Sequence, residues 1–331
     1  MKKHFTLILL FCSVVGQAAA PSLKKVATID LPGPPGARFD YLTLDDEDHY
    51  LLSAHLGPGI LYVIDTRTNK LVKAIPGVPE ITGLEYVPGL RKVYTSNRGE
   101  TKVGVVSLEQ MQVVKRIAIG QKPNGSTYAE PFAKMYVSTY GDEENIIDVH
   151  KDVVIKTLHF PEGTATPQYD STARKVFINL HGPNGSIAEV DPASDSVVGR
   201  YPIPGCQSGH GMALDAQGRR AFVLCNGNHV LTVFDLDAHR SITSIPIPTG
   251  ADVVKFDPGL KRIYAACASG AIVVVQEDDP LHFRKLEDFP VEPKVHSLAV
   301  DVNTHRVYAP EEEEGGRPVS RMVVYEPLSR N

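Results

Sequence analysis

The sequence lacks the short motifs that mark many catalytic and cofactor sites. It contains no GxSxG, no HExxH, no glycine-rich phosphate loop and no CxxC or CxxCH. The missing CxxCH excludes covalently attached c-type haem. A site assembled from side chains far apart in the chain leaves no such motif, so other chemistry stays open.

The chain also lacks an excess of basic charge. Its 34 Lys and Arg residues face 39 Asp and Glu residues, for a net charge of −5. This balance argues against a non-specific nucleic-acid binder, whose affinity depends on basic patches. Amphipathic helices of useful length are missing too, and 27 Gly and 25 Pro fit a chain with many turns.

A single apolar run at the N-terminus predicts an export signal. Lys2 and Lys3 precede apolar residues 5–15, and small residues follow. The run is too short to span a bilayer as a mature helix. We expect residues 1–20 to be a signal peptide cleaved near Ala18, and the mature protein to be periplasmic or secreted without a membrane span.

One sequence pattern recurs along the mature chain: a basic residue, then a variable position, then an aromatic residue that leads into small or polar residues. Examples are RKVYTSN, RRAFVLC and KRIYAAC, and a weaker copy, HYLLSAH, has leucine at the aromatic position. Successive anchors are 41 to 45 residues apart, which is a repeat architecture. The anchors are Leu52, Tyr94, Tyr136, Phe177, Phe222, Tyr264 and Tyr308.

Each repeat contains four short β-rich runs separated by turn residues. Seven such units predict an all-β fold, a seven-bladed β-propeller that forms a single domain over residues 22–328. The seventh repeat ends after its third run, 321–327, and residues 23–33 match the missing fourth run. We expect this N-terminal strand to complete the last blade, which closes the ring and makes a monomer sufficient. A pair of β-sandwiches is the alternative, and it leaves the period unexplained.

Three stretches, ARFDYLTLDDEDHYLLSAH, GLRKVYTSNRGETKVGVVSL and HRVYAPE, carry a family resemblance. The chain resembles the bacterial YncE-like proteins, which are propellers with YVTN-type repeats, and the resemblance covers essentially the whole mature chain. It implies a seven-bladed fold and an exported location. Quinoprotein amine dehydrogenase subunits and some lactonases share this fold, so the resemblance implies an architecture rather than a reaction.

The repeat also places a ring of residues at the start of the innermost strands. The position 12 residues before each anchor is mostly polar. Those positions are Asp40, Thr82, Asn124, Ala165, His210, Asp252 and His296. Two imidazoles and a carboxylate from neighbouring blades, His210, Asp252 and His296, could hold a divalent metal, the one cofactor that the sequence suggests.

A second ring follows the anchor strands and should open onto the same face. It consists of His55, Asn97, Arg98, Tyr140, His181, Asn226, Glu311 and Glu312. This face is the expected binding surface. The predicted ligand-binding residues are Asp40, His55, Asn97, Arg98, Asn124, Tyr140, His181 and Asn226. The alternative is that these polar groups only face the water of the channel.

The cysteines and one acidic run allow two further predictions. Cys206 lies in the loop that enters the fifth repeat, and Cys225 ends the second strand of that repeat. An exported protein favours a disulfide between them, with Cys267 as a free, partly buried thiol, and the alternative is three unpaired cysteines. The acidic run at residues 311–314 is expected to be a solvated, mobile loop.

The function that these observations favour is an exported binding or scaffold propeller, whose partner is a small molecule, a peptide or a cell-envelope component. A metal-assisted hydrolase of the lactonase type is one alternative, with water activated by the metal and an oxyanion stabilised by Arg98. A partner in quinone-linked oxidation and a pure interaction platform are the others. The sequence alone leaves open whether the protein is an enzyme.

Overall fold

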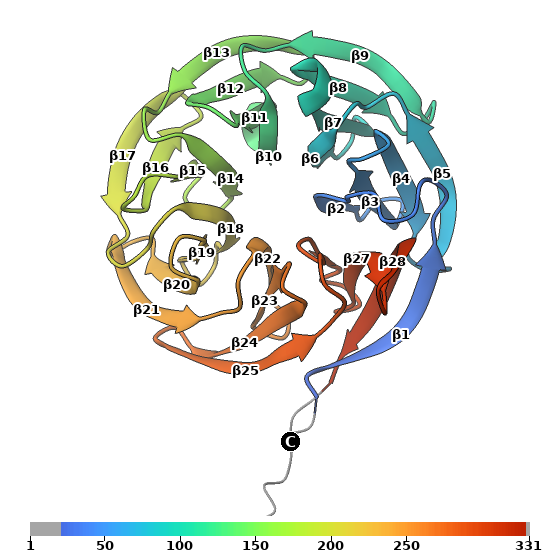
Figure 1. Cartoon of the computed structure of the whole chain (residues 1–331). Helices are drawn as coiled ribbons and strands as arrows, with labels where there is room; N and C mark the ends of the chain where they lie inside the picture. The colour runs from blue at the N-terminus through green and yellow to red at the C-terminus, as the bar shows by residue number, and fades with distance from the viewer. Residues whose placement is uncertain (1–20, 329–331) are drawn as a thin grey trace, which may run out of the picture.

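Seven four-stranded antiparallel sheets surround a central channel in the computed structural model, which describes residues 21–328 (Figure 1). The predicted seven-bladed propeller is therefore confirmed. The predicted signal peptide, residues 1–20, lies outside the described residues. Within residues 21–328, no helix is long and apolar enough to cross a membrane.

The first three blades follow one another along the chain and have the same strand order from channel to rim. Blade one contains β2 (Leu42–Asp45), β3 (Tyr50–His55), β4 (Ile60–Asp65) and β5 (Lys70–Pro76). Blade two contains β6 (Ile81–Val87), β7 (Lys92–Asn97), β8 (Lys102–Ser107) and β9 (Gln112–Ala118), with the short 3₁₀ helix η1 (Arg98–Glu100) after β7. Blade three contains β10 (Pro123–Ala129), β11 (Lys134–Thr139), β12 (Glu143–Asp148) and β13 (Val153–His159), with η2 (Glu130–Phe132) after β10.

The next three blades repeat this order. Blade four contains β14 (Thr164–Asp170), β15 (Lys175–Leu180), β16 (Ser186–Asp191) and β17 (Ser196–Pro202). Blade five contains β18 (Gly209–Asp215), β19 (Arg220–Cys225), β20 (Val230–Asp235) and β21 (Arg240–Pro246). Blade six contains β22 (Ala251–Asp257), β23 (Arg262–Cys267), β24 (Ala271–Asp279) and β25 (His282–Pro290).

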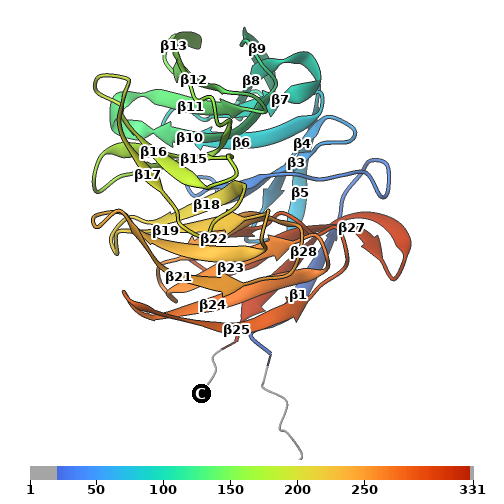
Figure 2. The same cartoon turned by 60° about the vertical axis from the view of Figure 1, so that its left-hand side comes forward.

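Blade seven joins the two ends of the chain. Its strands are β26 (Ala299–Val300), β27 (Val307–Glu314), β28 (Arg317–Pro327) and, at the rim, β1 (Leu23–Asp30). Strand β1 pairs antiparallel with β28, from Leu23 opposite Pro327 to Asp30 opposite Arg321, and both views show the two strands side by side (Figures 1 and 2). The N-terminal strand thus closes the ring as predicted.

The anchor residue of the sequence pattern, which is aromatic in six repeats and Leu52 in the first, is buried in the core of each blade. Every anchor lies on the second strand of its blade and is at most 2% exposed. The basic residue two positions earlier ties blades together in several repeats: Lys92 of blade two pairs with Asp152 of blade three at 3.0 Å, and Lys134 of blade three pairs with Asp195 of blade four at 2.8 Å. The pattern therefore encodes both the packing within a blade and the contact between blades.

The acidic run at residues 311–314 is not the solvated loop that the sequence predicts. It belongs to β27, which continues into a hairpin with β28. Glu311 and Glu312 are 3% and 6% exposed. Partners from other segments compensate the four charges, among them Lys294, which lies 3.0 Å from Glu313, and Arg321, which lies 2.9 Å from Glu314.

Candidate functional site

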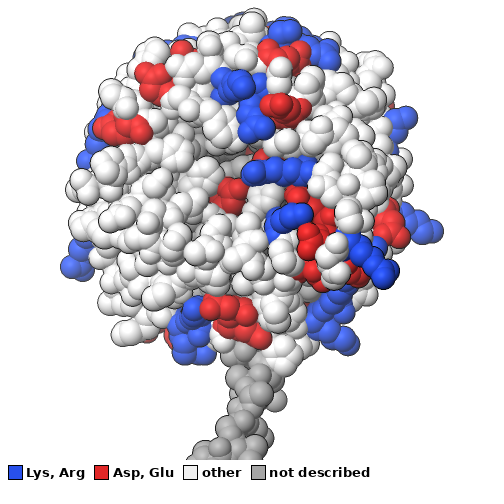
Figure 3. Space-filling view, viewed as in Figure 1, with Lys and Arg blue, Asp and Glu red and all other residues white. Residues whose placement is uncertain are grey.

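A pocket of about 430 Å³ opens at the mouth of the channel, over blades five, six, seven and one. The space-filling view shows this hollow at the centre of the ring, with basic and acidic side chains gathered beside it (Figure 3). The lining residues are Arg38, His210, Asn226, Gly250, Ala251, Asp252, Ala268, Lys294, His296 and Glu312. The predicted metal ligands all belong to this set.

His210 reaches the pocket because glycines flank it on β18. A Cβ at position 209 would lie 2.5 Å from the Oδ1 atom of Asn179, and a Cβ at 211 would lie 2.2 Å from the carbonyl oxygen of Asp252. Asn179 also donates from Nδ2 to the His210 carbonyl at 3.1 Å. The sequence GHG thus lets the innermost strands of blades four, five and six approach one another closely and fixes the histidine between them.

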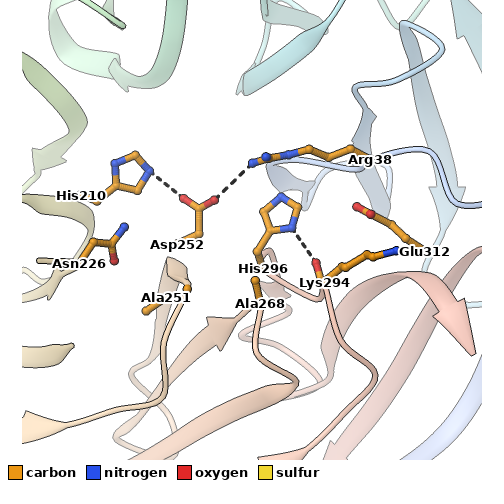
Figure 4. Close-up of a pocket in the computed structure, with 10 residues that line it drawn as sticks. Arg38, His210, Asn226, Ala251, Asp252, Ala268, Lys294, His296 and Glu312 are labelled. Carbon is orange, nitrogen blue, oxygen red and sulfur yellow. Dashed lines mark hydrogen bonds and ion pairs between the residues drawn. The ribbon is translucent and has the colours of Figure 1, made fainter. Parts of the chain in front are cut away.

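His210 and Asp252 form an ion pair between blades five and six. The Nε2 atom of His210 lies 2.7 Å from Oδ1 of Asp252, and each side chain is less than one-fifth exposed (Figure 4). Burial lowers the pKa of His210, but the charge and hydrogen bond of Asp252 outweigh it, so the pKa is raised. Burial raises the pKa of Asp252, yet His210, His296 and Arg38 together bring it below its ordinary value.

Arg38 extends across the pocket from the segment that links β1 to β2 (Figure 4). Its guanidinium lies 3.7 Å from Asp252 and 3.8 Å from Asp40, and its side chain is 53% exposed. These contacts are ion pairs that are longer than hydrogen bonds. The attraction between charges therefore holds the guanidinium in place, without directional hydrogen bonds to these carboxylates.

Asp40 supplies a third carboxylate, together with Asp252 and Glu312. It is 3% exposed and sits two residues before β2. Burial and the nearby charge of Asp252 raise the pKa of Asp40 to about 6, against the opposing effects of His296, Arg38 and His210. The carboxyl group therefore changes charge in a mildly acidic medium.

His296 directs an unpartnered nitrogen at the pocket. His296 is 6% exposed, and the Nδ1 atom of its ring lies 2.7 Å from the carbonyl oxygen of Lys294. Because a carbonyl only accepts, Nδ1 carries a proton, and in the neutral form of the ring Nε2 therefore offers a lone pair. Nε2 is buried and has no hydrogen-bond partner among residues 21–328.

The remaining polar groups of the pocket have partial partners. Glu312 accepts the Phe39 backbone N–H at 2.9 Å, and burial raises its pKa. The Nζ of Lys294 lies 3.0 Å from Glu313. Asn226 lines the opposite side, and its Oδ1 is a second buried acceptor that has no partner in the described part of the chain.

The channel is narrow below the pocket. The hydroxyl of Tyr41, from blade one, lies 3.1 Å from Oγ1 of Thr166 on β14 of blade four. Both residues are less than one-tenth exposed, and the space beside them measures only about 10 Å³. The pocket is consequently a cup with a floor at the level of this contact.

Three of the predicted ligand-binding residues lie outside the pocket lining but are at least partly exposed. The ring of His181 stacks on His210 with centroids 5.3 Å apart, and burial and the charge of His210 lower the pKa of His181. Arg98 lies 5.4 Å from the centre of the Tyr140 ring and donates to Glu80 at 3.0 Å. Tyr140 is 49% exposed.

The structure corrects the expected placement of His55. This residue is fully buried under the segment that links β1 to β2: its ring stacks on Phe39 with centroids 4.0 Å apart, and its Nε2 donates to the Ala37 carbonyl at 3.2 Å. Burial lowers the pKa of His55 to about 4. The histidine supports the packing of blade one and does not face the pocket.

Asn97 and Asn124 are also buried instead of lying on the face. Asn97 is fully buried; its Oδ1 accepts from Thr95 and its Nδ2 donates to Glu100, both at 2.9 Å. Asn124, the second residue of β10, is 3% exposed and does not line the pocket. Neither residue lines the pocket.

The predicted metal ligands share the pocket but are not arranged as a metal site. Within residues 21–328, no group of three or more His, Cys, Asp or Glu side chains could hold a metal ion. The physical reason is visible in the pairing, because the Asp252 carboxylate contacts His210 and Arg38. A divalent metal at these residues stays a prediction.

The sequence analysis missed Arg38 and Lys294. Both lie two positions before a ring residue, Arg38 before Asp40 and Lys294 before His296. That shared offset is the signal that could have found them. Their convergence on one pocket depends on the ring closing between blades seven and one.

A disulfide stabilises the loop beside the pocket. Cys206 and Cys225 are bonded, as predicted, with Cα atoms 5.2 Å apart. Cys225 directly precedes Asn226 of the pocket lining. Cys267 is free and fully buried, and burial raises the pKa of its thiol to about 12.

The fold and the pocket define a seven-bladed β-propeller with a polar cup at its channel mouth. No family model matches the chain, and no curated protein matches it. Among solved structures, the chain is similar to Kuenenia stuttgartiensis hydrazine synthase, with a TM-score of 0.56 and 16% sequence identity. The likeness covers 74% of this chain and 97% of that chain, and at this identity it shows the fold alone.

Proposed function

We propose that the protein is an exported binding propeller of the YncE-like type, whose pocket at the channel mouth takes a small polar molecule. The observation that carries this proposal is the buried Nε2 of His296, which faces the pocket without a partner in the described residues. Buried polar atoms in native proteins nearly always have a hydrogen-bond partner. A cup with a few convergent polar groups is also the usual form of a small-molecule site.

Two observations support export. Residues 1–20 have the composition of a signal peptide. The Cys206–Cys225 disulfide fits an oxidising compartment, since such bonds are rare in the cytosol. The YncE-like assignment is supported by the repeat motif and by its match to the seven blades.

The enzymatic alternatives have less support. In a metal-assisted hydrolase, His210 and Asp252 would have to exchange their mutual ion pair for metal coordination. Arg98, the predicted oxyanion stabiliser, pairs with Glu80 and does not line the pocket. A role in quinone-linked oxidation rests on the shared fold alone.

A thermal-shift screen tests the proposal. Wild type, His296→Ala and the exposed-turn control His150→Ala are heated with a library of small polar compounds and with zinc, calcium and copper salts. A ligand that binds only the native state raises the unfolding temperature. We expect at least one polar compound to stabilise wild type and His150→Ala but not His296→Ala. Equal stabilisation of all three proteins, or of none, would contradict the proposal.

A further inference from the structure

Several hydrogen-bond acceptors gather at the pocket. Asp252 and Glu312 line it, and Asp40 is close enough to reach the same arginine, 3.8 Å away. The lone pair of His296 Nε2 and the Oδ1 of Asn226 add two buried acceptors that lack partners within residues 21–328. A ligand that satisfies these groups must bring N–H or O–H donors.

Arg38 is a permanent cation that forms ion pairs with two of these carboxylates, Asp40 and Asp252. Its guanidinium makes no hydrogen bond with any described residue, and it approaches Asp252 and Asp40 no closer than 3.7 Å. Lys294, the other basic residue of the lining, pairs with Glu313. Arg38 also belongs to an interstrand segment and is more than half exposed, so it can move away without disturbing a strand.

We infer that the pocket takes a small organic cation with a primary ammonium group, in the place that the Arg38 guanidinium occupies. An ammonium has three donors and no acceptor. It can donate to His296 Nε2 and form charge-assisted hydrogen bonds with Asp40 and Asp252, the two carboxylates that Arg38 contacts. Arg38 then acts as an internal competitor that leaves the carboxylates when the ligand enters. This inference rests on the proposed binding function and names its ligand class.

Other ligand classes fit the pocket less well. A carboxylate could bind Arg38, but it would place a further negative charge beside Asp40, Asp252 and Glu312, which like charges disfavour. A neutral polyol could donate to the acceptors but would not replace the charge of Arg38. A divalent metal needs several ligand atoms around one point, and the described residues offer no such group.

The test compares three probes of similar size, n-butylamine, butyrate and 1-butanol, by NMR titration at pH 7 and low salt. Butylamine should shift the signals of residues around His296, and butyrate and butanol should not. Removing the competitor in Arg38→Ala should tighten butylamine binding about tenfold, and Glu312→Gln should weaken it about tenfold. Arg317→Ala, at an exposed position of the β27–β28 hairpin, is the matched control and should leave the affinity unchanged.

The direction of the Arg38 effect decides the inference. An arginine that anchors an anion would make Arg38→Ala lose butyrate binding, and this result would overturn the organic cation while leaving the proposed pocket intact. Weaker butylamine binding in Arg38→Ala would also overturn the inference. Arg38→Gln is measured alongside as a second variant without the charge, and the unfolding temperatures of both variants are compared with wild type to show that they fold. If no probe binds while the thermal-shift screen finds a different ligand, the inference fails alone; if that screen also finds nothing, the proposed function fails with it.

Discussion

The Nε2 atom of His210 on blade five lies 2.7 Å from the Oδ1 atom of Asp252 on blade six, at the start of the two innermost strands. Each residue occupies the same position in its repeat, 12 residues before the aromatic anchor. The repeat therefore brings an imidazole and a carboxylate together across a blade boundary. This pair forms one side of the pocket, where the Nε2 atom of His296 has no hydrogen-bond partner among the described residues.

The ion pair predicts a stability that depends on pH. The pKa of His210 is raised above its ordinary 6.5, so its contribution is complete below that value and is lost as the pH rises through the higher folded pKa. Asp252 has a lowered pKa, so its contribution is lost as the pH falls below its ordinary 3.8. We expect His210→Gln to lower the free energy of unfolding by about 1–2 kcal/mol at pH 6, and by less at pH 9.

Urea unfolding at the two pH values measures this difference. His159→Gln is the control, because His159 lies 3.6 Å from Asp142 in an exposed pair and should change the free energy by less than about 0.5 kcal/mol. A His210→Gln effect that is the same at pH 6 and pH 9 would show that the pair does not depend on charge.

Asp40 also predicts a stability that falls as the pH rises, but in weakly acidic solution. Its folded pKa of about 6 exceeds the ordinary 3.8, so the native state binds more protons between these values than the unfolded state. Its contribution makes the free energy of unfolding fall as the pH rises from about 4 to about 6, by up to about 3 kcal/mol. Asp40→Asn should remove this decrease, whereas Glu109→Gln at an exposed turn should retain it. Parallel pH profiles for wild type and Asp40→Asn would refute the assignment.

The disulfide predicts a loss of stability on reduction. Cys206 and Cys225 are 19 positions apart in sequence, and opening a loop of this size costs about 3 kcal/mol on the chain-entropy model. The double substitution Cys206→Ala, Cys225→Ala should therefore lower the free energy of unfolding by about this amount and remove its sensitivity to dithiothreitol. Cys267→Ala, which removes the buried free thiol, should leave that sensitivity in place. Insensitivity of wild type to the reductant would argue that the bond does not form.

Ring closure predicts that the first residues of the domain are structural. Leu23, on β1, is 1% exposed and packs in a cluster with Tyr264, Val295 and Val323 of blades six and seven. Leu23→Ala should lower the free energy of unfolding by about 3 kcal/mol. Val26 lies on the same strand and is 37% exposed, so Val26→Ala removes little buried apolar surface. At ~25 cal/mol per Å² of apolar burial, this substitution should lower the free energy of unfolding by less than about 1 kcal/mol. Equal costs at the two positions would mean that β1 does not close the ring.

The fold could be predicted from the sequence because the same physical requirement recurs in every repeat. A blade needs one large buried side chain on its second strand, and residues such as Tyr94 and Phe222 mark that position. The closing strand could be predicted because residues 23–33 repeat a pattern that the last blade lacks. His210, Asp252 and His296 could be placed at one pocket by counting back from these anchors.

The predictions that were wrong or missing concern residues whose contacts come from segments far apart in the chain. His55 was expected at the binding face, but the segment that links β1 to β2 covers it and stacks Phe39 on its ring. The acidic run at residues 311–314 was expected to be a mobile loop because it carries four like charges in a row. This prediction was wrong because the partners Lys294 and Arg321 become its neighbours only in the folded protein. Arg38 was missed for the same reason, since its reach across the pocket follows from ring closure.

The most direct test of the account is the protonation of the His296 ring. Nitrogen-15 NMR of the histidine side chains, with His296→Gln to assign the signal, reports which ring nitrogen carries the proton. The account predicts a proton on Nδ1, a lone pair on Nε2, and a shift of the Nε2 signal when a stabilising ligand or n-butylamine is added. A proton on Nε2, or an Nε2 signal that no ligand changes, would contradict the claim that this imidazole receives the ligand.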